Sequence, residues 1–216
     1  MEKKYLFFDI DGTLTDRSTG EIVPSAREAL TRLEENGHFV AIATGRAHYK
    51  ARKFTDANGF KNMVCCGGNG CVIDNELVEN IPLDKDGCIK IIHQAEELGY
   101  GWCVALDDTK DVYMTDDKFL RQVGKRKEPT RYIIDDMLEV EKADAIYKVY
   151  VAIPKEDEEK LTTKELVGHL RFEPEYLMFQ PDNKRGGIIK MMEHLNADIK
   201  DVVVFGDDYN DMDMFC

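Results

Sequence analysis

The feature of this sequence that most constrains its fold is an alternation of strand and helix patterns at its start. The short run Tyr5–Phe8 is apolar and aromatic, which is typical of a buried strand. Ser25 begins a predicted helix, with Glu28 completing a capping box, and Gly37 ends it. A second apolar run, Phe39–Ala43, predicts the next strand. Strand, helix and strand in this order indicate a parallel sheet with helices on its faces.

The same pattern returns near the end of the chain. Residues Ile188–Asn196 predict a helix, and Val202–Phe205 predict a buried strand that leads into Gly206 and Asp207. Two α/β stretches, 1–80 and 181–216, therefore flank a middle segment of different character. We expect them to form one discontinuous core.

The middle segment, 81–180, predicts an inserted α+β domain. Its helix candidate is Ile89–Leu98, and strands with polar partners indicate a sheet covered on one side only. The mixed segments that predict these strands are Gly101–Leu106, Asp111–Thr115 and Ile146–Ile153. The expected fold is thus α/β, a Rossmann-like core with an inserted domain.

Composition excludes several classes of partner. The net charge is −13, from 29 Lys and Arg against 42 Asp and Glu, which argues against binding to nucleic acid or anionic membranes. The one notable basic cluster, Lys125–Lys127, is expected to be a solvated face. The start of the chain lacks the form of a secretory signal, and the six cysteines follow no regular frame. We expect a cytoplasmic protein with free thiols.

The first chemical segment is Asp9-Ile10-Asp11-Gly12-Thr13, directly after the first strand. Residues two apart on an extended chain point the same way, so both carboxylates can face one pocket. They would repel each other unless a cation intervenes. The alternative is a plain acidic turn. A second D-x-D-G sequence, Asp84–Gly87, follows no apolar strand and is interpreted as a turn.

Two further segments offer groups for an anion. Thr44-Gly45-Arg46 follows the second strand, where a hydroxyl and backbone N–H groups can cradle phosphate, although Thr44 could instead be a helix N-cap. Lys184 stands just ahead of the Ile188 helix, where it could neutralise a phosphate or a carboxylate. A solvated surface lysine is the alternative.

The last segment is Gly206-Asp207-Asp208-Tyr209-Asn210-Asp211. Its density of oxygen ligands suits Mg²⁺, which prefers a few carboxylates together with water and substrate phosphate. The twelve-residue spacing of a calcium-binding EF-hand is absent. We therefore expect a magnesium site after the last strand.

Taken in order, the segments D-I-D-G-T-L-T, A-T-G-R, N-K and G-D-D-Y-N-D resemble the four motifs of the haloacid dehalogenase superfamily of phosphatases. The insert between the second and third motifs resembles the large α+β cap of the Cof-like branch, class IIB. The segment Gly67–Gly70 resembles the Asn-Gly segment that precedes that cap. The resemblance implies a core of this superfamily with an inserted cap domain.

The resemblance also implies catalytic and metal-binding roles. Asp9 matches the nucleophile and a metal ligand. Asp11 matches the general acid and base, and its main-chain carbonyl is a further metal ligand. Asp207 matches the acidic metal ligand, and Asp211 supports the metal shell or the lysine. The implied cofactor is Mg²⁺.

Phosphate and substrate contacts follow from the same comparison. Thr44, Gly45, Lys184 and Asn210 match phosphate-binding positions. Arg46 and Asn69 are expected to influence substrate specificity. The implied reaction is hydrolysis of a small phosphomonoester, a sugar phosphate or a phosphorylated cofactor such as a flavin or pyridoxal phosphate, through an aspartyl-phosphate intermediate.

Other functions remain open at this point. A phosphotransferase or phosphomutase could use the same aspartate, and a signalling module could hold a phosphoryl group on it. The superfamily's core normally continues past the position of Cys216 by about one βαβ unit of 30 residues. We therefore expect an incomplete C-terminal part with an exposed edge or apolar face near the fourth motif, and an inactive phosphate-binding relic is a further alternative.

Overall fold

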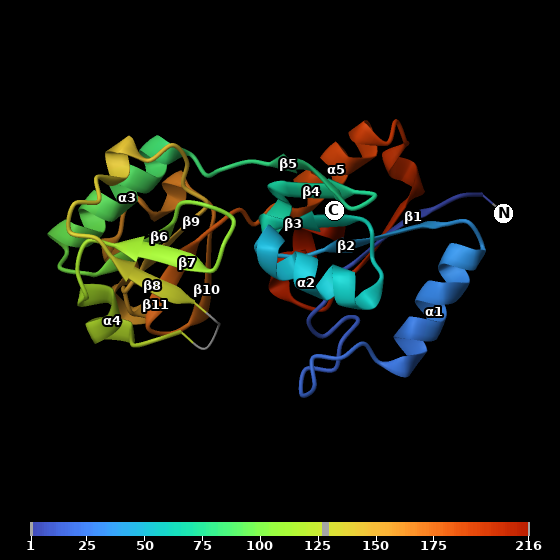
Figure 1. Ribbon diagram of the computed structural model, residues 1–216, viewed down its shortest axis with the longest axis horizontal. Helices are drawn as coiled ribbons and strands as arrows, with labels where there is room; N and C mark the ends of the chain where they lie inside the picture. The colour runs from blue at the N-terminus through green and yellow to red at the C-terminus, as the bar shows by residue number, and fades with distance from the viewer. Residues whose placement is uncertain (1, 127–129, 216) are drawn as a thin grey trace. The chain divides into compact units, whose positions relative to one another are not determined.

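The structure, a computed structural model, describes residues 2–126 and 130–215 (Figure 1). They form two compact units, one of Met1–Asn80 with Asp182–Cys216 and one of Ile81–Pro181. Among the described residues, no helix combines the length and the apolar character that crossing a bilayer requires.

The first unit is built on a six-stranded sheet with the order β12-β1-β2-β3-β4-β5. Strands β12, β1, β2 and β3 are parallel, whereas β4 and β5 are antiparallel additions. The strands are β1 (Tyr5–Phe8), β2 (Phe39–Ala43), β3 (Met63–Cys65), β4 (Gly70–Ile73), β5 (Glu76–Asn80) and β12 (Val202–Phe205). The helices are α1 (Pro24–Glu35), α2 (His48–Asn58) and α5 (Lys184–His194), and short 3₁₀ turns are η1 (Cys66–Gly68), η5 (Ile199–Asp201) and η6 (Tyr209–Phe215). The predicted α/β core is confirmed.

Helices cover both faces of this sheet because its strands are apolar on both sides. Leu6 and Phe8 of β1 pack in one cluster with Leu30 of α1. Phe7 points the other way and packs with Ile188 of α5. Alternate residues of one strand thus anchor the helices of opposite layers.

The end of α1 follows the prediction, but its start does not. Gly37 has a φ of +81°, and the N–H of His38 donates to the carbonyl of Leu33, the pattern of a Schellman motif. The helix begins at Pro24, and its N-cap, Val23, makes no side-chain cap. The predicted capping box from Ser25 is wrong because proline, which lacks an N–H, already sets the first turn.

Strand β12 forms one edge of the sheet. Its Val203 and Phe205 side chains are 39% and 38% exposed, although Phe205 stacks on Phe8 at a ring separation of 4.5 Å. An apolar edge therefore lies directly before the loop that carries Asp207.

The second unit holds another six-stranded sheet, with the order β10-β11-β9-β6-β7-β8. Its strands pair antiparallel except for β7 and β8. They are β6 (Trp102–Ala105), β7 (Asp111–Met114), β8 (Arg131–Ile134), β9 (Lys148–Val151), β10 (His169–Glu173) and β11 (Tyr176–Phe179). The helices are α3 (Lys85–Glu97) and α4 (Lys118–Val123), with 3₁₀ turns η2 (Val140–Lys142), η3 (Lys155–Lys160) and η4 (Lys164–Leu166). The predicted α+β insert is confirmed.

Both faces of this second sheet are apolar, so the prediction of cover on one side only is wrong. Trp102 and Val104 pack in a cluster with Ile91 of α3. Cys103, between them, packs in a separate cluster with Phe119 of α4. The uninterrupted apolar sequence of β6 requires cover on both sides.

The D-x-D-G sequence at Asp84 starts a helix and is not a free turn. Asp84 is the N-cap of α3, and its carboxylate accepts a hydrogen bond from the N–H of Gly87 at 2.7 Å. Helix α3 therefore begins four residues before the predicted start at Ile89, because this cap satisfies its first turn.

The two described residues of the basic cluster, Lys125 and Arg126, lie in different environments. Lys125 is exposed, as expected of a solvated face. The guanidinium of Arg126 instead lies 3.9 Å from the centroid of the Tyr150 ring. Lys127 lies outside the described residues. The five cysteines within the described residues carry free thiols: Cys65, Cys66, Cys71, Cys88 and Cys103.

Candidate active site

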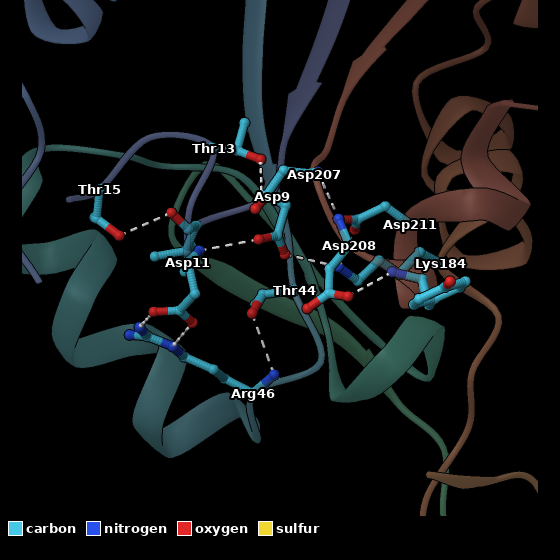
Figure 2. Close-up of polar contacts among 12 residues, drawn as sticks. Asp9, Asp11, Thr13, Thr15, Thr44, Arg46, Lys184, Asp207, Asp208 and Asp211 are labelled. Atoms are coloured by element: carbon cyan, nitrogen blue, oxygen red, sulfur yellow. Dashed lines mark hydrogen bonds and ion pairs between the residues drawn. The ribbon is translucent and has the colours of Figure 1, made fainter. Parts of the chain in front are cut away.

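Asp9 lies at the carboxyl end of β1, in the centre of the first unit's polar site (Figure 2). Its N–H donates to the carbonyl of Phe205 at 2.9 Å, which extends the pairing with β12 by one residue. The residue is only 7% exposed, and its Oδ2 accepts a hydrogen bond from the N–H of Asp11 at 2.9 Å. Asp11 itself is exposed. The two carboxylates of the motif therefore have different environments.

Lys184 joins the first and last motifs. Its Nζ lies 2.7 Å from Oδ1 of Asp9 and 2.6 Å from Oδ1 of Asp211. The lysine is 1% exposed and is the first residue of α5, whose N-cap is Asn183. The predicted helix start at Ile188 is thus four residues late. The alternative of a solvated surface lysine is wrong, because the side chain is buried between two carboxylates.

Opposing effects decide the charge of this cluster. Burial lowers the pKa of Lys184, but the carboxylates of Asp9 and Asp211 outweigh it and raise that pKa above its usual value. Burial raises the pKa of Asp9, and the ammonium of Lys184 opposes the shift. The lysine is therefore held as a cation inside the site.

Glycines of turn η1 hold the start of α5 in place. Gly68 has a φ of +109°, and a Cβ on it would lie 2.0 Å from the carbonyl oxygen of Asn183. The N–H of Asn183 donates to the carbonyl of Gly67 at 2.9 Å. This close approach fixes the residue that precedes Lys184. The Gly-Gly pair was visible in the sequence, but only the fold reveals its partner.

Asp211 organises the loop after β12. It is fully buried, and its Oδ2 accepts hydrogen bonds from the N–H groups of Asp207 and Asp208, both at 3.1 Å. Its other oxygen contacts Lys184. The Asp211 carboxylate thus stabilises the conformation of the loop after β12 and also orients the ammonium of Lys184.

Asp207 is bound by two groups from the loop after β1. The hydroxyl of Thr13 donates to Oδ1 at 2.8 Å, and Nη2 of Arg17 donates to Oδ2 at 2.5 Å. Burial raises the pKa of Asp207, but these two donors outweigh it and hold the pKa below its usual value. Gly12 allows the approach, since a Cβ there would lie 2.2 Å from Oδ2. Sequence reasoning missed Arg17, which belongs to no motif.

Three of these carboxylates could hold a metal ion. One oxygen each from Asp9, Asp207 and Asp211 lies within 4.8 Å of the other two, the one such cluster among the residues that the structure describes. An all-oxygen donor set suits a hard divalent cation such as Mg²⁺. The donors present therefore fit the metal that the sequence implies.

The second motif lies beside Asp11. Thr44 is 2% exposed, and its Oγ1 accepts a hydrogen bond from the N–H of Arg46 at 3.2 Å. Gly45 lies in the bend between Thr44 and Arg46. The Arg46 side chain donates two hydrogen bonds to the carboxylate of Asp11 (Figure 2). Helix α2 has Ala47 as its N-cap, so the alternative of Thr44 as a helix cap is wrong.

Two predicted asparagines occupy less central positions. Asn210 is half-buried in turn η6, one residue before Asp211. Asn69 is half-buried and caps turn η1, where its N–H donates to the carbonyl of Cys66. Their side chains are placed in the first unit, but their contacts with substrate stay predictions.

The fold and the site together define an α/β protein with a polar site at the carboxyl ends of its parallel strands, where such folds bind ligands. Residues 6–216 match the family of haloacid dehalogenase-like hydrolases, and the chain belongs to that family.

Relatives extend this assignment. YkrA of Bacillus subtilis, whose name describes it as a phosphatase, is 28% identical over 217 residues, covering 99% of this chain and 83% of YkrA. The pyridoxal phosphate phosphatase YbhA of Escherichia coli is 27% identical over 236 residues, covering 99% of this chain and 85% of YbhA. The structure of the subclass IIB sugar phosphatase BT4131 shares the fold, with a TM-score of 0.72 at 22% identity over 98% of this chain and 84% of that one. The protein is an enzyme of the phosphatase class, with a capped fold of this superfamily.

Proposed function

We propose that this enzyme hydrolyses a small phosphomonoester through a phosphoryl-aspartate formed on Asp9, with Mg²⁺ as its cofactor. One observation carries the proposal. Asp9 is a nearly buried carboxylate at a strand end, 2.7 Å from the ammonium of Lys184 and within 4.8 Å of the carboxylates of Asp207 and Asp211.

Asp9 supplies the nucleophile. Its Oδ2 is held by the N–H of Asp11 and its Oδ1 by Lys184, so the carboxylate is fixed before substrate arrives. Attack by an aspartate oxygen on phosphorus, with departure of the alcohol, splits hydrolysis into two easier steps. Water then attacks the phosphorus of the phosphoryl-aspartate, which breaks the bond to Asp9, releases inorganic phosphate and regenerates the carboxylate.

Charge neutralisation is the main requirement, because a phosphate dianion approaches several carboxylates. Lys184 provides one permanent positive charge between Asp9 and Asp211. Mg²⁺, held by Asp9, Asp207, Asp211 and the main-chain carbonyl of Asp11, would supply further positive charge at the phosphoryl oxygens. Positioning and neutralisation together make up most of the catalysis of phosphoryl transfer.

Asp11 is proposed as the general acid and base. Its carboxylate is exposed and is held by Arg46, so it can face both the leaving alcohol and the attacking water. In its protonated form it donates a proton to the alcohol oxygen in the first step, and the carboxylate so formed takes a proton from the attacking water in the second. Thr44, Gly45 and Asn210 are proposed to bind the phosphoryl oxygens.

The substrate class is proposed from relatives and from the insert. YbhA is named as a pyridoxal phosphate phosphatase and BT4131 as a sugar phosphatase, which supports a sugar phosphate or a phosphorylated cofactor here. We propose that the unit Ile81–Pro181 is the cap domain and that its residues select among such substrates. Arg46 and Asn69 of the first unit are proposed to contribute to this selection.

The decisive experiment replaces the nucleophile. Asp9→Asn should abolish hydrolysis of an aryl phosphate in the presence of Mg²⁺. Asp86→Asn is the matched control, since Asp86 is an exposed residue of the second D-x-D-G sequence and lies in helix α3. Full activity of Asp9→Asn would remove the nucleophile assignment, whereas equal losses in both variants would indicate a general effect on folding.

A further inference from the structure

All three carboxylates of the candidate metal site have a cationic partner from the chain itself. Lys184 contacts Asp9 and Asp211 at 2.7 and 2.6 Å. Arg17 contacts Asp207 at 2.5 Å. The acidic cluster is therefore neutralised in part by two different side chains.

The two cations differ in how firmly they are held. Lys184 is 1% exposed and its ammonium lies between Asp9 and Asp211, so it cannot leave without stranding two buried carboxylates. The side chain of Arg17 is 66% exposed and lies in the loop after β1. Its ion pair with Asp207 can open at little cost, because exposed ion pairs contribute little to stability.

Both carboxylate oxygens of Asp207 are already used by this loop. Thr13 donates a neutral hydroxyl to Oδ1, and Arg17 donates a charged guanidinium to Oδ2. A divalent cation that binds Asp207 meets no charge from Thr13. It meets a full positive charge from Arg17, which it must displace or tolerate as a neighbour.

We propose that Arg17 is an internal counter-ion that competes with the divalent cation for Asp207 and so sets the metal affinity of the site. This inference rests on the proposed function, since it takes Asp207 as a metal ligand. Arg17 limits the affinity for the cation, and in exchange it relieves repulsion within the acidic cluster whenever the cation is away. The residue acts on the metal and has no contact with the reacting atoms.

The test measures Mg²⁺ binding directly, by isothermal titration calorimetry at one fixed low salt concentration. Arg17→Gln should lower the Kd for Mg²⁺ by about two- to fivefold relative to wild type, the range expected for loss of an exposed charge pair. Arg17→Lys keeps the charge and should restore a Kd within about twofold of wild type.

The matched control is Arg52→Gln. Arg52 pairs with Asp56 at 2.7 Å on helix α2 of the same unit, so this variant loses one charge without touching Asp207. Its Kd should equal that of wild type. An equal change in both glutamine variants would mean that net charge, and not the local pair, sets the affinity, and would overturn the inference.

Thermal unfolding gives a second readout that does not depend on turnover. Because a ligand that binds only the folded state stabilises it, Mg²⁺ should raise the Tm of Arg17→Gln more than that of wild type. Equal Kd values and equal Tm increments for wild type and Arg17→Gln would overturn the inference alone. Absence of Mg²⁺ binding by the wild type would overturn the proposed function and this inference together.

Discussion

The guanidinium of Arg46 holds the carboxylate of Asp11 through two hydrogen bonds, Nε to Oδ2 at 3.1 Å and Nη2 to Oδ1 at 2.5 Å. The arginine is itself restrained, since its guanidinium carbon lies 5.4 Å from the centroid of the Phe54 ring. A bidentate contact fixes the plane of a carboxylate as well as its position. The second motif therefore orients the residue that we assign to proton transfer.

Removal of this contact should slow turnover more than it weakens substrate binding. We expect Arg46→Ala to lower kcat about tenfold. General acid–base catalysis accelerates a reaction by about 10²–10⁴-fold, and a wrongly oriented Asp11 would lose part of that acceleration. Arg46→Lys keeps the positive charge but cannot make the bidentate contact, so its kcat should lie between those of Arg46→Ala and wild type. Steady-state kinetics on an aryl phosphate separates kcat from KM. A rise in KM alone would instead support the specificity role expected for Arg46.

Lys184 should be important for folding as well as for chemistry. Lys184→Met leaves Asp9 and Asp211 as buried carboxylates without their shared cation, and removing one partner of a buried ion pair costs about 3–5 kcal/mol. Urea unfolding measures the loss. Lys190→Met is the control, because Lys190 is on the same helix but is half-exposed and lies 3.4 Å from Glu79. Equal stabilities for the two variants would contradict the assigned energetics.

Much of the core could be predicted because three of the four motifs follow an apolar strand. The predicted bounds of Tyr5–Phe8, Phe39–Ala43 and Val202–Phe205 are those of β1, β2 and β12. Parallel strands bring their carboxyl ends to one edge of the sheet, but the pairing of β1 with β12, which places Asp9 near Asp207, is known only from the structure.

Contacts that depend on loop conformation could not be predicted. Arg17 reaches Asp207 across 190 positions of sequence, and no local pattern distinguishes it from a solvated arginine. The helix starts at Pro24 and Lys184 were missed since caps depend on which neighbouring group satisfies the first turn. Cover on both faces of the second sheet was missed because its strands were predicted from segments that mix polar and apolar residues, although the apolar sequence of β6 itself indicates such cover.

The close packing of Gly68 on Asn183 should make this glycine irreplaceable. Gly68→Ala places a methyl group against backbone atoms at a φ of +109°, so we expect a loss of about 1–3 kcal/mol together with a fall in activity as Lys184 shifts. Gly20→Ala is the matched control. Gly20 also has a positive φ, of +71°, but a Cβ there meets nothing within 4 Å. The difference between the two variants in urea unfolding isolates the clash, and no difference would show that backbone strain alone is responsible.

The second unit should lose stability in acid through Glu158. Its carboxylate lies 2.6 Å from Nε of Arg171, and although burial raises its pKa, this arginine outweighs the effect and holds the pKa below its ordinary value near 4.5. A depressed pKa in the folded state means that the stabilisation is present above pH 4.5 and is lost as the pH falls through the folded-state value.

Glu158→Gln removes this ionisation while keeping the shape of the side chain. We expect the variant to be about 0.5–1 kcal/mol less stable than wild type at pH 7 and to show a flatter decline in stability below pH 4.5. Glu159→Gln is the control, since Glu159 is an exposed neighbour whose carboxylate lies 2.6 Å from Nζ of Lys164. Urea unfolding between pH 3 and pH 7 compares the three proteins. Parallel curves for wild type and Glu158→Gln would contradict the predicted shift, because a group that titrates at its unfolded-state value contributes no pH dependence to folding.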